Sequence, residues 1–272
     1  MTDKTLTFIG AGNMARSLIA GLIQDNTPLT IQVSDPSSSQ CLHIQKHWPQ
    51  VNTFEDNQTA CEQSDIIVLA VKPQMLTAVC QNLKATVQKN KPLIISIAAG
   101  VTEQTINDAL GGNQAIVRCM PNTPALVQAG ATGLYANNKV TTAQKDLAES
   151  ILRAVGITLW VDKESLINSI TAVSGSGPAY FFLVMEAMQK TAIDLGLDKK
   201  AAHLLVLQTA LGAAKLAIES DDDVGELRQR VTSKGGTTEA AIKTLQIGGL
   251  EVLFADALNA AAQRSIELSQ ST

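Results

Sequence analysis

Near its start the chain reads Phe8-Ile9-Gly10-Ala11-Gly12-Asn13-Met14-Ala15, a GxGxxA pattern that follows a short apolar run and opens a helical pattern. Gly10 permits a tight turn, Gly12 lets the backbone approach a ligand, and Ala15 is small enough for close helix–sheet packing. The first turn of the helix offers free N–H groups and the positive end of its dipole to phosphate oxygens. The stretch therefore predicts a dinucleotide-binding unit whose cofactor contacts are Gly10, Ala11, Gly12, Asn13, Met14 and Ala15.

The first 160 or so residues repeat this alternation of strand and helix. Short runs rich in Val and Ile, bounded by Gly, Pro, Asn or Asp, are typical of buried parallel strands. They lie at 6–9, 31–34, 65–71, 93–98, 115–120, 133–136 and 158–161. Helical patterns lie between them at 13–24, 37–46, 74–84, 102–110 and 142–154. The alternation predicts an α/β fold that begins with a Rossmann-like doubly wound sheet.

After residue 161 the strand-like runs end and helical periodicity continues to the C-terminus. We expect a dinucleotide-binding domain over 1–162 and an all-α domain over 163–272, which the resemblance described below identifies as the dimerisation and substrate domain. The helix expected at 201–218 is apolar most of the way round, so burial on several sides is expected. A monomer would expose large apolar patches there, which predicts a homo-oligomer.

The composition narrows the function classes. A net charge of -4 with no basic run argues against general nucleic-acid binding, and 45% hydrophobic residues argue against disorder. Cys41, Cys61, Cys80 and Cys119 form no CxxC pair and, with three histidines, no metal-ligand spacing, so we expect free thiols and no metal. No signal peptide and no uncharged apolar stretch of membrane-spanning length is recognisable, so the expected location is the cytoplasm.

Asp35 bears on the choice of cofactor, and the residues leave that choice open. It lies about 20 residues beyond Ala15, where an acidic side chain accepts the ribose hydroxyls of NAD. Ser34 and the serines at 37–39 surround it, and Pro36 can start a helix whose N–H groups suit a phosphate. Asp35 could also simply cap that helix. Ser34 and Asp35 are predicted cofactor contacts under either cofactor.

Three more segments follow predicted strands and so belong at the carboxyl edge of the sheet, where ligands bind. They read Ala-Val-Lys-Pro-Gln at 70–74, Ser-Ile-Ala-Ala-Gly at 96–100 and Met-Pro-Asn-Thr-Pro at 120–124. In the helical half, Val-Thr-Ser-Lys-Gly-Gly-Thr-Thr at 231–238 places two glycines and two hydroxyl residues at a helix start. That arrangement predicts a second anion site, although a plain capped turn would show the same pattern.

Together these motifs resemble the pyrroline-5-carboxylate reductase family, and the resemblance covers essentially the whole chain. It rests on GAGNMA at 10–15, AVKPQ at 70–74, RCMPNTP at 118–124, SGSGPAY at 174–180 and VTSKGGTT at 231–238. The last of these is the most diagnostic. One departure is Lys234, where the family usually has proline, and we expect it to alter the mobility of the loop.

The resemblance implies reduction of 1-pyrroline-5-carboxylate to L-proline with NAD(P)H, the last step of proline biosynthesis. It favours NADPH while leaving NADH open, and it implies a homodimer of the kind that in this family often assembles into rings of five dimers. Further cofactor contacts carried over from the family are Asn57, Val71, Lys72, Pro73 and Ala98. The substrate contacts carried over are Ser233, Gly235, Gly236, Thr237 and Thr238, with the opposite subunit supplying part of the site.

The residues also fit a mechanism with little side-chain acid–base chemistry. A cyclic imine is basic enough to take its proton from solvent, so Thr238 is expected to hydrogen-bond the ring nitrogen and orient it. The substrate carboxylate would rest on backbone N–H groups around 235–237. Two alternatives stay open: a related cyclic-imine or beta-hydroxyacid reductase on the same plan, and a non-enzymatic oligomer that senses the dinucleotide.

Overall fold

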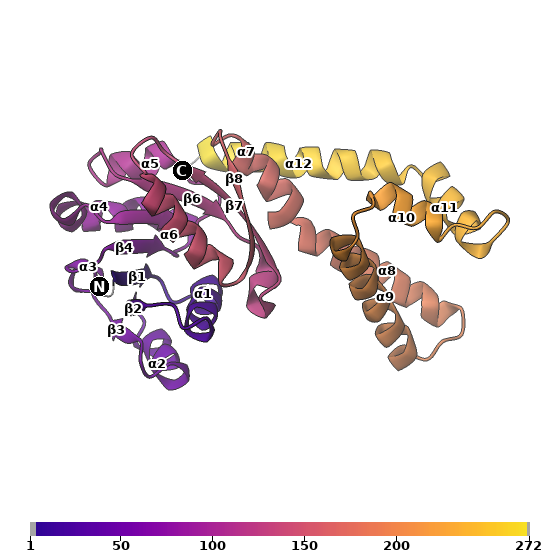
Figure 1. Ribbon diagram of the computed structural model, residues 1–272, viewed down its shortest axis with the longest axis horizontal. Coiled ribbons are helices and arrows are strands. Elements are labelled where there is room, and N and C mark those ends of the chain that lie inside the picture. Colours follow the sequence, from indigo (N-terminus) through magenta and orange to yellow (C-terminus); the bar gives the residue numbers. More distant parts are fainter. Residues whose placement is uncertain (1–3, 271–272) are drawn as a thin grey trace. The chain divides into compact units, whose positions relative to one another are not determined.

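A computed structural model describes residues 4–270, and the chain divides into two units (Figure 1). One unit contains the residues up to Ser176 and those from Ala260 on, and the other is Gly177–Asn259. The functional boundary expected at residue 162 stays a prediction.

The first unit is built on a mostly parallel sheet. Within the described residues it has eight strands in the order β3-β2-β1-β4-β5-β6-β7-β8. Neighbouring strands are parallel except β6 and β7, which are antiparallel. The strands are β1 Lys4–Ile9, β2 Leu29–Ser34, β3 Asn52–Phe54, β4 Ile66–Leu69, β5 Leu93–Ser96, β6 Ile116–Met120, β7 Gly130–Ala136 and β8 Gly156–Val161. The expected Rossmann-like fold is confirmed.

Alternating side chains of the central strands enter two separate cores. In β1, Leu6 and Phe8 join the core beneath α1, α2 and α6, whereas Ile9 joins the core beneath α4 and α5. Strand β4 divides its four apolar side chains between the same two cores. Because both faces are covered, these strands are continuous apolar runs. Each fully buried Leu, Ile or Phe side chain contributes about 1.5–3 kcal/mol to stability.

The helices of this unit follow the predicted alternation (Figure 1). They are α1 Asn13–Gln24, α2 Ser38–His47, α3 Asn57–Cys61, α4 Pro73–Asn90, α5 Glu103–Ala109, α6 Thr142–Arg153 and α7 Leu166–Ile170, with short turns η1 Thr123–Val127 and η2 Thr171–Gly175. Strand β3 and helix α3 were not predicted, because three and five residues are too short to show a period. The side chain of Asp56 caps α3 and accepts the backbone N–H of Thr59 at 2.8 Å.

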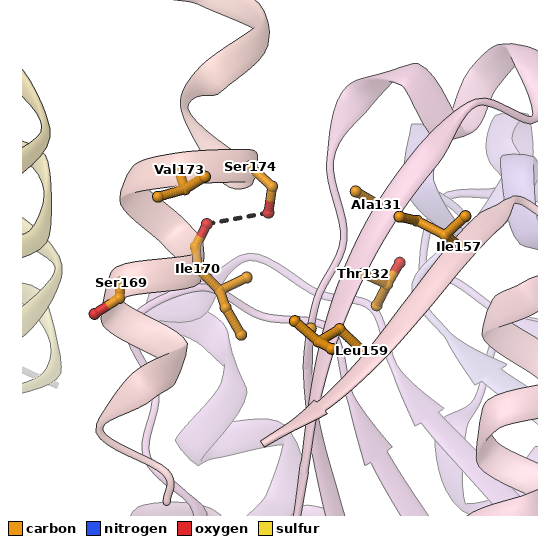
Figure 2. Close-up of a pocket in the computed structure, with 9 residues that line it drawn as sticks. Ala131, Thr132, Ile157, Leu159, Ser169, Ile170, Val173 and Ser174 are labelled. Atoms are coloured by element: carbon orange, nitrogen blue, oxygen red, sulfur yellow. Dashed lines mark hydrogen bonds between the residues drawn. The ribbon is translucent and has the colours of Figure 1, made fainter. Parts of the chain in front are cut away.

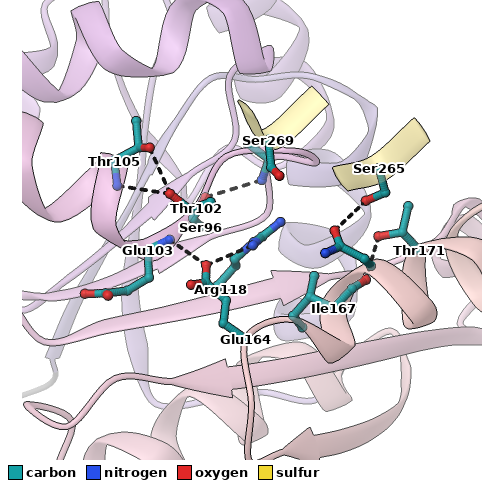
Figure 3. Close-up of polar contacts among 12 residues, drawn as sticks. Ser96, Thr102, Glu103, Thr105, Arg118, Glu164, Ile167, Thr171, Ser265 and Ser269 are labelled. Atoms are coloured by element: carbon teal, nitrogen blue, oxygen red, sulfur yellow. Dashed lines mark hydrogen bonds and ion pairs between the residues drawn. The ribbon is translucent and has the colours of Figure 1, made fainter. Parts of the chain in front are cut away.

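The second unit is helical, as expected for the C-terminal half. Its helices are α8 Gly177–Asp194, α9 Lys199–Glu219, α10 Val224–Arg230, α11 Thr237–Ile247 and most of α12 Leu250–Gln270. The C-terminal part of α12 belongs to the first unit, where Ser265 Oγ donates to Asn168 Oδ1 at 2.8 Å (Figure 3). Between α10 and α11 lies the loop with the VTSKGGTT sequence.

Helix α9 is apolar, but the rest of the chain covers little of its surface. Only Ala202 and Val206 are buried in it. By length and composition α9 could cross a membrane, although three lysines and a glutamate lie within it. A partner protein that covered this helix would account for the same composition, as the sequence predicts.

The four cysteines are buried free thiols. Burial raises the pKa of Cys61 and of Cys80 to about 12, and it raises that of Cys119 as well. At neutral pH these three thiols are protonated and therefore poor nucleophiles and poor metal ligands.

Candidate functional site

The predicted cofactor segments meet at one edge of the sheet. Strand order reverses between β1 and β4, and ligands of doubly wound sheets bind outside the carboxyl ends of the strands at such a point. Because β1, β2, β4, β5 and β6 are mutually parallel, the loops that follow them share this edge. The loops after β1, β2, β4 and β5, with the strand and helix ends that adjoin them, carry all the predicted cofactor contacts except Asn57, so these contacts are brought together. Asn57 lies at the same edge, hydrogen-bonded to Ser34.

Gly10 is held where only glycine fits. Its φ is +102°, and a Cβ there would lie 2.7 Å from the carbonyl oxygen of Ala70 and 3.2 Å from Val71 Cγ1. The loop after β1 therefore touches the loop after β4, which continues through Lys72 into Pro73, the first residue of α4. Gly12 differs, since a Cβ on it would meet nothing within 4 Å. It precedes α1 directly, so the open space lies where a phosphate could approach the N–H groups of that helix.

The carboxylate of Asp35 binds backbone on both of its oxygens. Oδ2 accepts the N–H of Ala11 at 2.9 Å, and Oδ1 accepts the N–H of Ser37 at 2.9 Å. Asp35 thus joins the glycine loop to the turn that begins α2. Both oxygens face the chain's own amides, so the side chain has a structural task besides any contact with a ribose.

Other predicted cofactor residues line the same edge. Ser34 Oγ donates to Asn57 Oδ1 at 2.7 Å, which places the start of α3 beside the end of β2. Ala98 is 5% exposed, and its N–H reaches Ser96 Oγ at 3.4 Å in the loop after β5. Small side chains there keep the backbone close to whatever binds.

Arg16 was missed by the sequence reasoning. It lies in α1, four residues after Gly12, and its Nη2 donates to Gln40 Oε1 in the first turn of α2. Its Nε is buried and has no hydrogen-bond partner in residues 4–270. Partial burial and the nearby Arg16 guanidinium lower the pKa of His43. The signal that could have identified it is a cation in the first turn of the helix that follows the glycine loop.

A partly buried ion pair links β6 to the loop after β5 (Figure 3). Arg118 is 3% exposed, and its Nη1 lies 2.8 Å from Glu164 Oε1. The same oxygen accepts the N–H of Glu103, the first residue of α5, at 2.6 Å. The pair thus ties β6 to α5 and to the segment that precedes α7, and Arg118 has a role although the sequence assigned it none.

Asn122 fixes the loop that follows β6. Its Oδ1 accepts the N–H of Ala131 at 2.9 Å, and its Nδ2 donates to the carbonyl oxygen of Ser174 at 3.0 Å. A Cβ on Gly175 would lie 2.5 Å from Met120 Cε, so the two segments also pack closely. The RCMPNTP and SGSGPAY motifs are therefore in direct contact.

In the second unit the VTSKGGTT loop forms a tight turn. The N–H of Gly236 donates to the carbonyl oxygen of Ser233 at 3.0 Å, and Gly235 has a φ of +72°. A glycine with positive φ at the third position is the type II pattern. Glu239, in the first turn of α11, accepts the N–H of Gly235 at 2.7 Å through Oε2. The amides of both glycines are therefore engaged inside the loop.

The start of α11 still offers donors. The first intrahelical bond runs from Ala240 N–H to the carbonyl oxygen of Gly236, so the amides of Thr237, Thr238 and Glu239 precede it. Among the described residues, no hydrogen bond engages the hydroxyl of Ser233, Thr237 or Thr238. A Cβ on Gly236 would lie 2.7 Å from Ser233 Oγ, so glycine at this position leaves room for that hydroxyl. In the described part of the chain, three amides and three hydroxyls are thus free to bind an anionic ligand that carries a polar ring atom.

An apolar groove lies elsewhere, at the β8 edge of the sheet. Figure 2 shows Ile170 and Val173 on one side and Ile157 and Leu159 of β8 on the other. Ile157 is 72% exposed and Leu159 is 62% exposed. No charged group lines the groove, so it suits a protein surface better than a small polar substrate.

Each half of the chain matches a family model of its own, and the curated relatives match the chain over nearly its whole length. Residues 164–268 match the family described as pyrroline-5-carboxylate reductase dimerisation, and residues 5–100 match NADP oxidoreductase, coenzyme F420-dependent. The chain is 51% identical to the pyrroline-5-carboxylate reductase of Pseudomonas aeruginosa over 99% of its length and 98% of the relative's. It is 46% identical to that of Pasteurella multocida over 99% of both chains.

Solved structures agree. The fold is similar to a pyrroline-5-carboxylate reductase from Coxiella burnetii, with a TM-score of 0.93, 50% identity, and coverage of 98% of this chain and 99% of that one. It is also similar to the Plasmodium falciparum pyrroline carboxylate reductase solved with NADP bound, with a TM-score of 0.85, 30% identity and 99% coverage of both chains.

Proposed function

Because the chain belongs to the pyrroline-5-carboxylate reductase family, we propose how its residues carry out the family's reaction, the reduction of 1-pyrroline-5-carboxylate to L-proline with NAD(P)H. The glycine loop, Asn57, the segment Val71-Lys72-Pro73 and Ala98 hold the cofactor. The loop 231–238 holds the substrate. The observation that best supports the cofactor assignment is the close approach of Gly10 to Ala70, next to the open space at Gly12.

We propose NADPH as the preferred cofactor. Arg16 presents a guanidinium with an unpartnered buried Nε beside the first turn of α2, where the serine hydroxyls and helix N–H groups suit a phosphate. The Asp35 carboxylate is drawn towards the amides of Ala11 and Ser37, which reduces its repulsion of a 2′-phosphate. A relative solved with NADP supports the same preference.

The reaction itself is the first test. Purified protein should oxidise NADPH faster than NADH, only when pyrroline-5-carboxylate is present, with L-proline as the product. The measurement is the initial rate of absorbance loss at the reduced nicotinamide band. If folded protein that still binds NADPH oxidised neither cofactor, the proposed reaction would be rejected. The non-enzymatic oligomer that senses the dinucleotide would then be the better hypothesis.

Replacing Arg16 with alanine should weaken the preference for NADPH. An ionic contact to a phosphate contributes about 1.5–3 kcal/mol, which corresponds to a fall of about 10- to 100-fold in kcat/KM for NADPH. The value for NADH, which lacks that phosphate, should change little. Gln40→Ala is the matched control, because it removes the partner of Arg16 and keeps the guanidinium. Equal losses with both cofactors would contradict the assignment.

For the substrate, the amides of Thr237 and Thr238 receive the carboxylate, together with the hydroxyls of Ser233 and Thr237. Gly235 and Gly236 contribute by their backbone conformation, since their own amides are already bonded. The Thr238 hydroxyl accepts the N–H of the protonated ring nitrogen and orients the imine carbon. A bound reduced nicotinamide supplies the hydride, and the protein's part is positioning.

The chain is a homo-oligomer in this reading, since the dimerisation family matches residues 164–268. We propose that the partner subunit covers helix α9 and the exposed side chains Phe181 and Phe182 of α8. A partner that covers α9 would explain its apolar surface without insertion into a membrane. The proposed location of the enzyme is therefore the cytoplasm. Assembly of dimers into a decamer remains part of the proposal.

A further inference from the structure

The turn at 233–236 lacks the residue that would stiffen it. In a type II turn the second position is pre-set when it is proline, because the ring fixes φ near −65°. Lys234 occupies that position here, and lysine leaves φ free in the unligated loop. Its N–H donates to nothing among the described residues, so a proline would remove no hydrogen bond. Lys234 itself is exposed.

Glu239 supplies the missing restraint from outside the turn. Its Oε2 lies 2.7 Å from the N–H of Gly235, which belongs to the central peptide of the turn. That peptide is the one whose orientation distinguishes a type II turn from a type I turn. A carboxylate acceptor makes the bond stronger than a bond between neutral groups. The side chain that holds the turn therefore starts from the helix whose first residues are Thr237 and Thr238.

Among the described residues, no neighbouring cation forms an ion pair with Glu239 that would compete with its bond to Gly235. Arg228 and Lys243 line the same surface hollow as Glu239. Within residues 4–270, neither cation comes within ion-pair distance of its carboxylate. The bond to Gly235 is the interaction that the structure gives this side chain.

We propose that Glu239 is a positioning residue for the substrate. Its hydrogen bond holds the turn 233–236, as the ring of a proline at 234 would hold it. The proposal rests on the assignment of loop 231–238 to the substrate. It predicts that the two restraints substitute for one another. Glu239 should matter with lysine at 234 and should matter little with proline there.

Four variants test this: Glu239→Ala, Glu239→Gln, Lys234→Pro, and the double variant Lys234→Pro with Glu239→Ala. Glu239→Ala should raise KM for pyrroline-5-carboxylate about two- to tenfold, the worth of one such hydrogen bond, with KM for NADPH unchanged. Glu239→Gln keeps an acceptor oxygen and should stay near the wild type. Lys234→Pro alone should change little, and the double variant should return KM to within about twofold of the wild type.

The outcome that would overturn the proposal is a double variant no better than Glu239→Ala, with the same melting temperature as the wild type. An unchanged KM in Glu239→Ala would overturn it as well. Hydrogen exchange of the peptide that covers 231–238 is the second readout, and Glu239→Ala should speed it. Because exchange needs no turnover, it tests whether Glu239 holds the turn even if pyrroline-5-carboxylate proves not to be the substrate. Unchanged exchange in Glu239→Ala would also reject the proposal that Glu239 holds the turn.

Discussion

Replacing Gly10 with alanine is expected to raise the dissociation constant for NADPH about 100-fold or more. The φ of +102° disfavours any side chain, and the new Cβ would lie 2.7 Å from the carbonyl oxygen of Ala70. That neighbour is backbone in the loop after β4, so it cannot rotate away as a side chain could. Strain of about 1–3 kcal/mol together with the clash must move one loop relative to the other. The two loops proposed to hold the cofactor would then no longer match it.

Two further glycine variants separate the causes. Gly112→Ala also imposes a positive φ, +83°, but meets nothing within 4 Å and lies away from the cofactor edge, so it should cost stability and leave affinity unchanged. Gly12→Ala has no clash in the protein, so it should keep the melting temperature and lose affinity. Titration of the fluorescence of NADPH measures binding, and thermal unfolding measures stability. Wild-type affinity in Gly10→Ala would show that the loop contact does not shape the site.

The sequence predicted the first unit well because its signals are local. The glycine loop and the apolar periodicity fix α1, whose predicted bounds of 13–24 match those observed. Buried parallel strands have continuous apolar runs, so β4 and β5 were visible, although each is shorter than predicted. The carboxyl-edge placement of the cofactor segments then followed from topology alone.

Contacts between distant residues were not predictable in the same way. Arg118 and Glu164 are 46 residues apart, and nothing in either segment indicates that they pair. Arg16 and Gln40 meet only because α1 and α2 lie on the same face of the sheet. The antiparallel β7 was not expected either, because a short apolar run carries no sign of its direction. The bond between Glu239 and Gly235 spans only four residues, but the glutamate lies just past the VTSKGGTT motif, and the sequence assigned it no role.

Replacing Thr238 with alanine is expected to lower kcat about 100-fold, because the imine carbon would lose the group that orients it for hydride transfer. The hydroxyl is half-buried at the start of α11 and has no hydrogen-bond partner in the described part of the chain, so its removal breaks no structural bond. Alanine is also the better helix former, so the fold should be unaffected. The loss should therefore appear in turnover, with the affinity for NADPH and the melting temperature unchanged.

The same substitution at Thr244 is the matched control for Thr238. Thr244 lies in the same helix, but its hydroxyl donates to the carbonyl oxygen of Ala240 one turn back, a bond that a helix does not need. Thr244→Ala should leave kcat at the wild-type value, and Thr238→Ser, which keeps the hydroxyl, should retain most of the activity. If Thr238→Ala and Thr244→Ala had equal kcat, the ring nitrogen would have to be oriented by another group. The hydroxyls of Ser233 and Thr237, which are also free in this loop, would then be the first to replace.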